Sequence, residues 1–306
     1  MSPEFLLSLL AATVQSGTPI LYATLGEILT ERCGVLNLGV EGIMMVGALA
    51  GFLVSLSTGH PMLGFVAGGI FGAAAAAIHG GVCLGFQGNQ VVSGLALTIL
   101  GVSLAEYLGT PFIGRNAPGF FSAPVPVLSA IPVLGPVFFR QDLLVYFSYL
   151  LPAVLWWFFR FTRWGLSCKA VGENPDAATA AGLSVTGYRW AGICVGGFFV
   201  GLGGAYLSLA YTHLWTNNLS AGRGWIAVAL VIFAFWRPER AVVGAYLFGG
   251  VMAFQLRLQA MGTNLPSSLL LMLPYVLTVV VLVLSMRQNK TGDAPAALGV
   301  NTEPRE

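Results

Sequence analysis

Long apolar runs separated by short polar stretches dominate the hydrophobic pattern of this chain. The clearest runs cover residues 5–26, 61–86, 190–211 and 268–286, and none of them contains Asp, Glu, Lys or Arg. A helix of about 20 mostly apolar residues crosses about 30 Å of hydrocarbon. Hydrocarbon offers no water to backbone polar groups, and the runs are too continuous for barrel strands. They therefore predict transmembrane α-helices.

Weaker runs complete the pattern. The predicted spans are 5–26, 35–56, 61–86, 90–109, 142–160, 190–211, 225–236, 241–260 and 268–286. The run 225–236 would rise only about 18 Å as a helix, which is too short to cross alone. The sequence thus predicts an all-α, polytopic membrane bundle of about nine transmembrane helices (eight to ten), with a broken or re-entrant element at 225–236.

Composition and charge orient this bundle. Hydrophobic residues make up 56% of the chain and charged residues 8%, against roughly a quarter charged in soluble domains. Basic residues gather around the loop 164–189, at 237–240 and in the tail, and such loops usually face the cytoplasm. We therefore predict one transmembrane domain, 1–286, with a cytoplasmic loop at 164–189. The tail 287–306 is predicted to be disordered and cytoplasmic, and the proline-rich stretch 111–139 to be an external loop.

Catalytic and metal-binding motifs are missing from the sequence. Lys169 and Lys290 are the only lysines, and neither stands in a Walker A pattern. The three histidines form no HExxH motif, and the four cysteines fall singly, without metal-ligand spacing. We predict no catalytic residues, no metal site and no cofactor, so the chain is not expected to be an enzyme.

The loop 164–189 contains the signals of a short helix. Asn174 is a good N-cap, Pro175 suits the first helical position, and Gly182 suits the residue after the helix. The sequence predicts a helix over 175–181 with a body of small residues. Two interpretations stay open: a solvated connector, or a coupling helix that inserts into a groove of a partner.

Acidic residues near the first two runs differ in their setting. Glu27 and Glu31 are expected to lie in water at the cytoplasmic end of a span. Glu41 lies several residues inside an apolar run, where a carboxylate usually faces a cavity or a partner. We leave open a structural role, with Glu41 paired to the backbone or to Arg32, and a role in a solute pathway.

Polar residues also occur at three further places at membrane depth. These are the sets Asn89, Gln90 and Ser93; Asn217, Asn218, Ser220 and Arg223; and Gln255, Arg257 and Gln259. Such sets suit a neutral polar ligand better than protons or metal ions, although ordinary helix packing also explains them. Glycines four residues apart, as at 64, 68 and 72 or at 197 and 201, predict close helix packing.

Four sequence blocks resemble one known family. GEILTERCGVLNLGVEGIMMVGALAGF (26–52), NQVVSGLALTILG (89–101), AVGENPDAATAAGLSV (170–185) and SAGRGWIAVALVIFAFWRP (220–238) resemble the permease subunits of bacterial ABC importers for nucleosides and simple sugars. That family is related to the ribose and branched-chain amino-acid permeases. A secondary transporter, which would need membrane charges for ion coupling, is the alternative from another class.

The resemblance, together with the polar pattern, gives two sets of site residues. The predicted ATPase-coupling residues are Gly172, Glu173, Asn174, Pro175, Ala177, Ala178, Ala181 and Gly182. The predicted pathway residues are Asn37, Glu41, Asn89, Gln90, Ser93, Asn217, Arg223 and Trp225. The implied partners are a cytoplasmic ABC ATPase subunit, a second permease subunit (a paralogue), an extracytoplasmic solute-binding protein, a small polar solute and the lipid bilayer of the bacterial inner membrane. No nucleic acid is expected.

Overall fold

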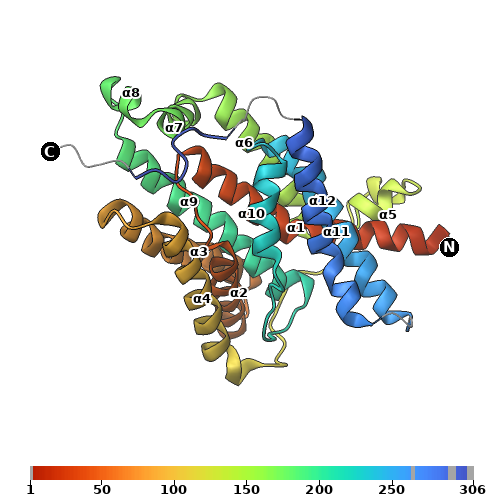
Figure 1. Ribbon diagram of the computed structural model, residues 1–306. Helices are drawn as coiled ribbons and strands as arrows, with labels where there is room; N and C mark the ends of the chain where they lie inside the picture. The colour runs from red at the N-terminus through yellow and green to blue at the C-terminus, as the bar shows by residue number, and fades with distance from the viewer. Residues whose placement is uncertain (1–2, 263–265, 289–293, 302–306) are drawn as a thin grey trace.

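The computed structural model describes residues 3–262, 266–288 and 294–301 and is almost entirely helical (Figure 1). In chain order the described residues form α1 (Pro3–Arg32), α2 (Val40–Thr58), α3 (Pro61–Gly80), α4 (Gln90–Gly109), α5 (Leu134–Phe138), α6 (Leu143–Phe161), α7 (Arg163–Glu173), α8 (Pro175–Ala180), α9 (Val185–Tyr206), α10 (Arg223–Phe233), α11 (Pro238–Ala260) and α12 (Ser267–Gln288). One π-turn extends α3 over Gly81–Gly85 and another extends α9 over Leu207–Tyr211.

Each of the nine predicted apolar segments contains a helix, although 35–39 precede α2 and 234–236 form a turn after α10. Within the described residues, 7 helices are long and apolar enough to cross a membrane, and the two shorter apolar helices are Arg223–Phe233 and Leu269–Val281. The all-α membrane fold is therefore confirmed. The predicted count of about nine spans corresponds to these 7 long helices together with the two shorter ones. The weak segment 225–236 corresponds to α10, which follows a long irregular turn.

Three sequence expectations need correction. Glu27 and Glu31 are not in water, because α1 runs on to Arg32 and packs both carboxyl groups inside the bundle, 0% and 2% exposed. The loop before α8 holds a second helix, α7, which Thr162 caps by accepting the Gly165 N–H.

The third correction concerns the tail. Residues 294–301 pack against the protein, whereas 289–293 and 302–306 lie outside the described residues. The Ala297 N–H donates to the Gly172 carbonyl at 2.9 Å, and Arg189 donates to the Val300 carbonyl at 3.0 Å. Residues 294–301 are thus ordered by hydrogen bonds to the body of the protein.

Glycines allow the central helices to touch through their backbones. Helix α9 packs against α1, α2 and α3. A Cβ atom on Gly204 would lie 1.9 Å from the Met44 carbonyl oxygen, and one on Gly201 would lie 2.3 Å from the Gly68 carbonyl oxygen. Both distances are far inside van der Waals contact, so these positions require glycine. The four-residue spacing predicted this close packing for Gly68 and Gly201.

Gly204→Ala is therefore expected to lower the free energy of unfolding by about 3 kcal/mol, the upper end for an overpacked core. Thermal unfolding in detergent, followed by size-exclusion fluorescence, measures the change. Gly81→Ala is the matched control, because a Cβ at Gly81 meets nothing within 4 Å. Equal melting temperatures for the two variants would contradict the close α2–α9 contact.

The helices define two ends of the molecule. Helices α7 and α8 lie at one end, and the C-terminal end of α4 lies at the other (Figure 1). The proline-rich stretch after α4 packs against the segment after α9, where the Ala117 N–H donates to the His213 carbonyl at 3.2 Å. It also meets the end of α2, where the Ser55 hydroxyl donates to the Pro118 carbonyl.

Candidate functional site

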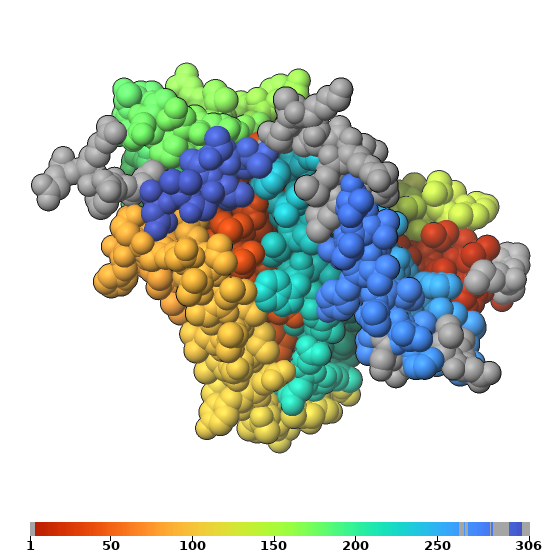
Figure 2. All heavy atoms as spheres, in the orientation of Figure 1, coloured from red at the N-terminus to blue at the C-terminus, as the bar shows by residue number. Residues whose placement is uncertain are grey.

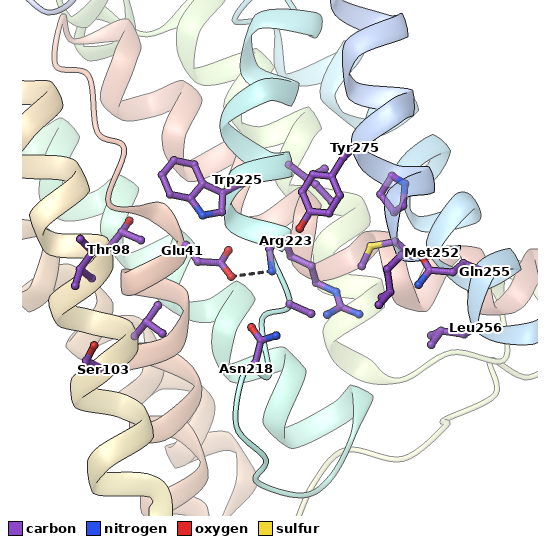
Figure 3. A pocket seen from close by; sticks show the side chains of 17 residues that line it. Glu41, Thr98, Ser103, Asn218, Arg223, Trp225, Met252, Gln255, Leu256 and Tyr275 are labelled. Carbon is purple, nitrogen blue, oxygen red and sulfur yellow. Dashed lines mark hydrogen bonds between the residues drawn. The ribbon is translucent and has the colours of Figure 1, made fainter. Parts of the chain in front are cut away.

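A cavity of about 690 Å³ lies among α2, α4, α10, α11 and α12. Its lining mixes apolar walls with a few polar side chains, as is usual for a small-molecule site. The polar and aromatic members are Glu41, Thr98, Ser103, Asn218, Arg223, Trp225, Gln255 and Tyr275. Figure 3 shows Glu41 at the centre, with Thr98 and Ser103 on one side and Arg223 and Tyr275 on the other.

Glu41 caps the N-terminus of a neighbouring helix. Its Oε1 accepts the Ser220 hydroxyl at 2.5 Å and the Gly222 N–H at 2.8 Å, and its Oε2 accepts the Gly224 N–H at 2.6 Å. Gly222 is the N-cap residue of α10 and Gly224 lies in its first turn, where N–H groups have no partner within the helix. The carboxylate, 5% exposed, therefore satisfies these donors and favours the positive end of the helix.

The turn before α10 has a strained backbone, which hydrogen bonds from Glu41 on α2 hold in place. Asn218 and Ala221 have φ angles of 54° and 47°, a left-handed region that side chains other than glycine rarely adopt. A Cβ on Gly224 would lie 2.5 Å from the Glu41 Cα, so α2 and α10 touch at this point. The bonds from Glu41 thus fix a costly conformation in the cavity wall.

Arg223 brings a buried cation to the same wall. It is 5% exposed; its Nη1 donates to the Ser220 carbonyl at 3.1 Å, and the guanidinium lies 5.2 Å from the centre of the Tyr211 ring. Among the described residues, its Nε has no hydrogen-bond partner. That N–H is itself buried, so it is an unpaired donor within the cavity wall.

Three of the predicted pathway residues line the cavity: Glu41, Arg223 and Trp225. The Glu41 carboxylate bonds to backbone N–H groups, one of the partners expected for a structural role, and it also faces the cavity, so its role in a solute pathway stays a prediction. Asn217 is exposed on the turn, and its neighbour Asn218 takes the place in the lining.

The other four predicted pathway residues lie outside this cavity and bond to other parts of the protein. Asn37 accepts the Gly39 N–H at 2.8 Å, and Asn89 caps α4 by accepting the Val92 N–H at 3.0 Å. Gln90 accepts the Leu36 N–H at 2.8 Å. The Ser93 hydroxyl lies 3.0 Å from the His79 Nδ1.

Several cavity residues could not be recognised from the sequence. Thr98 and Ser103 lie on α4 and Tyr275 lies on α12, each inside a long apolar run. A single hydroxyl group in such a run does not indicate whether the side chain faces a cavity, another helix or lipid. Gln255 belongs to one of the polar sets predicted at membrane depth, but only the folded structure shows that it shares the cavity with Glu41 and Arg223.

The short helix α8 forms as predicted. The Asn174 side chain accepts the Ala177 N–H at 2.9 Å, and Gly182 has a φ of 82°. Ala178 is buried, 3% exposed, and packs with Val171 and Val185. The helix therefore has an inner side fixed to α7 and α9, and an outer side that includes the exposed residues Ala177 and Ala181.

The segment 294–301 lies beside the predicted coupling residues. The Ala296 N–H donates to a Glu173 carboxylate oxygen at 3.3 Å, next to the Ala297 bond to Gly172. At its other end Asn301 accepts from Gln90 at 2.9 Å. Figure 2 shows this dark-blue segment between the green α7–α8 region and the orange α3. It thus joins the loop before α4 to the α7–α8 loop.

A bundle of membrane-length helices around a cavity of mixed polarity is the architecture of a membrane transport protein. Comparison with known proteins agrees with this class. Residues 9–284 match the family described as branched-chain amino acid transport system / permease component, and the chain belongs to this family. It is a multi-pass permease component, and the family is not a catalytic one.

Several relatives resemble the chain over most of its length. It is 45% identical over 266 residues to a proposed glucose ABC transporter permease protein, TsgC13, of Haloferax volcanii, covering 86% of this chain and 81% of the relative. It is 36% identical over 303 residues to the nucleoside ABC transporter permease protein NupC of Lactococcus lactis, covering 93% of each.

A further relative and one solved structure complete the comparison. The guanosine ABC transporter permease protein NupQ of Bacillus subtilis is 32% identical over 314 residues and covers 97% of each chain. An inward-facing structure of a proposed metal-chelate type ABC transporter superposes with a TM-score of 0.50 at 17% identity, covering 90% of this chain and 84% of that chain. At that identity the likeness concerns the fold alone.

Proposed function

We propose that this chain is the permease subunit of an ATP-driven importer that passes a nucleoside or a related small polar solute across a bacterial inner membrane. The observation that carries the proposal is the cavity, where buried hydrogen-bonding groups stand beside two aromatic rings. Trp225 and Tyr275 are 39% and 49% exposed. Their faces can stack on a nucleobase, as aromatic side chains do in nucleic-acid binding.

The polar groups of the cavity suit an uncharged polar solute. Arg223 lines the cavity as a hydrogen-bond donor, and the amides of Asn218 and Gln255 can both donate and accept hydrogen bonds. Glu41 already accepts three bonds from the protein, which leaves little capacity for a cation. A sugar is the second candidate, because the relative with 45% identity is named for glucose.

The proposed assembly places the ATPase at the α7–α8 end. In this assignment Gly172, Glu173, Asn174, Pro175, Ala177, Ala178, Ala181 and Gly182 form the coupling region, which faces the cytoplasm together with the C-terminus. A second permease subunit completes the path, and an extracytoplasmic protein delivers the solute. ATP hydrolysis belongs to the separate ATPase subunit.

Uptake into cells that express the chain together with a candidate ABC ATPase and a candidate second permease subunit tests this function. Labelled guanosine should accumulate, and a Walker A lysine substitution in the ATPase should stop it. Unlabelled nucleoside should compete, whereas glucose should not. If glucose competes and nucleosides do not, the transported solute is a sugar. Uptake driven by an ion gradient without the ATPase would favour a secondary transporter.

The orientation gives a separate prediction. Ala180→Cys on α8 should react with a membrane-impermeant maleimide only from the cytoplasmic side, and Ala123→Cys in the proline-rich stretch only from outside. Both positions are exposed, whereas the native cysteines are buried or half-buried, so the background should be low. Labelling of Ala123→Cys from the cytoplasm would reverse the proposed topology.

A further inference from the structure

A second cavity, of about 370 Å³, lies at the α7–α8 end of the molecule and shares no lining residue with the first. We call it the basic pocket. It is bounded by the ends of α1 and α6, by α7 and by the turn between α10 and α11. Its lining residues are Arg32, Trp156, Phe159, Arg160, Lys169, Trp236, Arg237, Pro238 and Glu239.

Positive charge exceeds negative charge in the basic pocket. Among the described residues that line it, Arg32, Arg160, Lys169 and Arg237 are basic and Glu239 is acidic. A further acid, Glu31, is buried nearby, where its Oε2 accepts the Trp236 indole N–H. The balance stays positive even when this group is counted as charged.

Aromatic rings hold these cations in position. The Arg160 guanidinium lies 5.9 Å from the centre of the Trp156 ring, and the Lys169 ammonium lies 5.7 Å from the centre of the Phe159 ring. Burial, followed by the charges of Arg32 and Arg160, lowers the pKa of the Lys169 ammonium. The cations therefore repel one another, and a bound anion would relieve that repulsion.

The end of α6 contributes both to the basic pocket and to an exposed apolar surface. On α6, next to the pocket, Val154, Trp157 and Phe161 are 44%, 55% and 61% exposed, an apolar surface suited to lipid tails. Tryptophan is typical of the membrane–water boundary, and lipid phosphates lie at the same depth. Basic pockets between transmembrane helices bind such headgroups.

We propose that the basic pocket binds the phosphate-bearing headgroup of an anionic lipid. The headgroup would contact α1, α6, α7 and the α10–α11 turn together, and its acyl chains would lie along the apolar face of α6. The site is separate from the solute cavity. The proposal needs the membrane location of the family but not the identity of the solute.

Native mass spectrometry of the delipidated full-length chain, titrated with phosphatidylglycerol or phosphatidylcholine, tests this site. We expect phosphatidylglycerol to bind and phosphatidylcholine not to bind at the same concentrations. Arg160→Gln with Lys169→Gln should weaken phosphatidylglycerol binding roughly 25-fold, since each basic residue near an anionic surface contributes about fivefold. Arg160→Gln alone changes one exposed side chain and should weaken binding about fivefold.

The matched control is Arg163→Gln with Arg240→Gln, which removes the same charge at the same end but outside the pocket lining. It should bind phosphatidylglycerol like the unmodified chain. Equal losses in both double variants would reduce the effect to general surface charge and overturn the site.

Two other results would also overturn the proposal. Inorganic phosphate that displaces phosphatidylglycerol completely, at an ionic strength where chloride does not, would make this a free-phosphate site. Unchanged lipid binding combined with loss of the copurifying ATPase in the pocket variant would make it part of a protein interface. Guanosine uptake is measured separately, so failure of the lipid site would leave the proposed function standing.

Discussion

Ala181→Arg is expected to abolish solute uptake while leaving the protein folded. Ala181 is exposed at the end of α8, so a larger side chain there meets no internal packing. A cation also suits the negative end of a helix, so α8 should persist. On the outer surface of α8, however, the arginine would prevent close contact with the ATPase. The measurements are guanosine uptake, melting temperature and copurification of the ATPase.

Two comparison variants isolate the effect on the partner. Ser57→Arg adds the same charge to an exposed helix end near the proline-rich stretch, and it should keep the ATPase bound. Ala178→Arg should instead lower the melting temperature, because Ala178 is packed between α7 and α9. Normal ATPase copurification and uptake in Ala181→Arg would refute the coupling assignment.

Glu41→Ala is expected to lower both stability and uptake strongly. The change leaves the N–H groups of Gly222 and Gly224 without acceptors at the start of α10. Two buried unsatisfied donors, at about 1 to 3 kcal/mol each, lower the free energy of unfolding by about 4 kcal/mol. Without the cap, the strained turn that carries Asn218 and Arg223 should relax and distort the cavity. Uptake per folded molecule should fall by more than roughly tenfold.

Glu27→Ala is the comparison variant, and its choice depends on a burial that the sequence did not predict. Glu27 is fully buried and accepts the Asn37 N–H at 3.1 Å, yet it does not line the cavity. Its removal should reduce the folded yield but leave uptake per folded molecule within about twofold. The loss of an internal contact away from the cavity lowers stability without changing the solute path. If both variants lose uptake per folded molecule equally, the cavity is not the solute path.

The apolar pattern predicted the spans because each long run must be a helix in lipid. Local signals also sufficed for α8, where Asn174, Pro175 and Gly182 mark both ends. The pattern could not show that Glu27 is inside, because burial between helices and exposure at a helix end give the same sequence signal. Thr98 and Tyr275 were missed for a related reason: lipid-facing and cavity-facing positions of α4 and α12 are both largely apolar.

The docked segment 294–301 was beyond prediction for another reason. Its bonds to Gly172 and Glu173 run from the backbone N–H groups of Ala297 and Ala296, which any non-proline residue carries. Composition alone indicated disorder for the whole tail. The side-chain contacts of Asn301 with Gln90 join residues far apart in the chain, and only the fold brings them together.

The backbone contacts at the glycines limit which helices can move. Gly204 touches Met44, Gly224 touches Glu41, and Gly249 touches Gly17 across neighbouring helices. Tilting one of these helices against another would drive carbonyl oxygens into Cα atoms, so they behave as one rigid block. Helix α12 contributes Leu271, Pro274 and Tyr275 to the cavity without a glycine of its own. Its internal Pro274 lacks the N–H that would complete the helix ladder at cavity depth, so we expect α12 to be the wall that moves first when the cavity changes width.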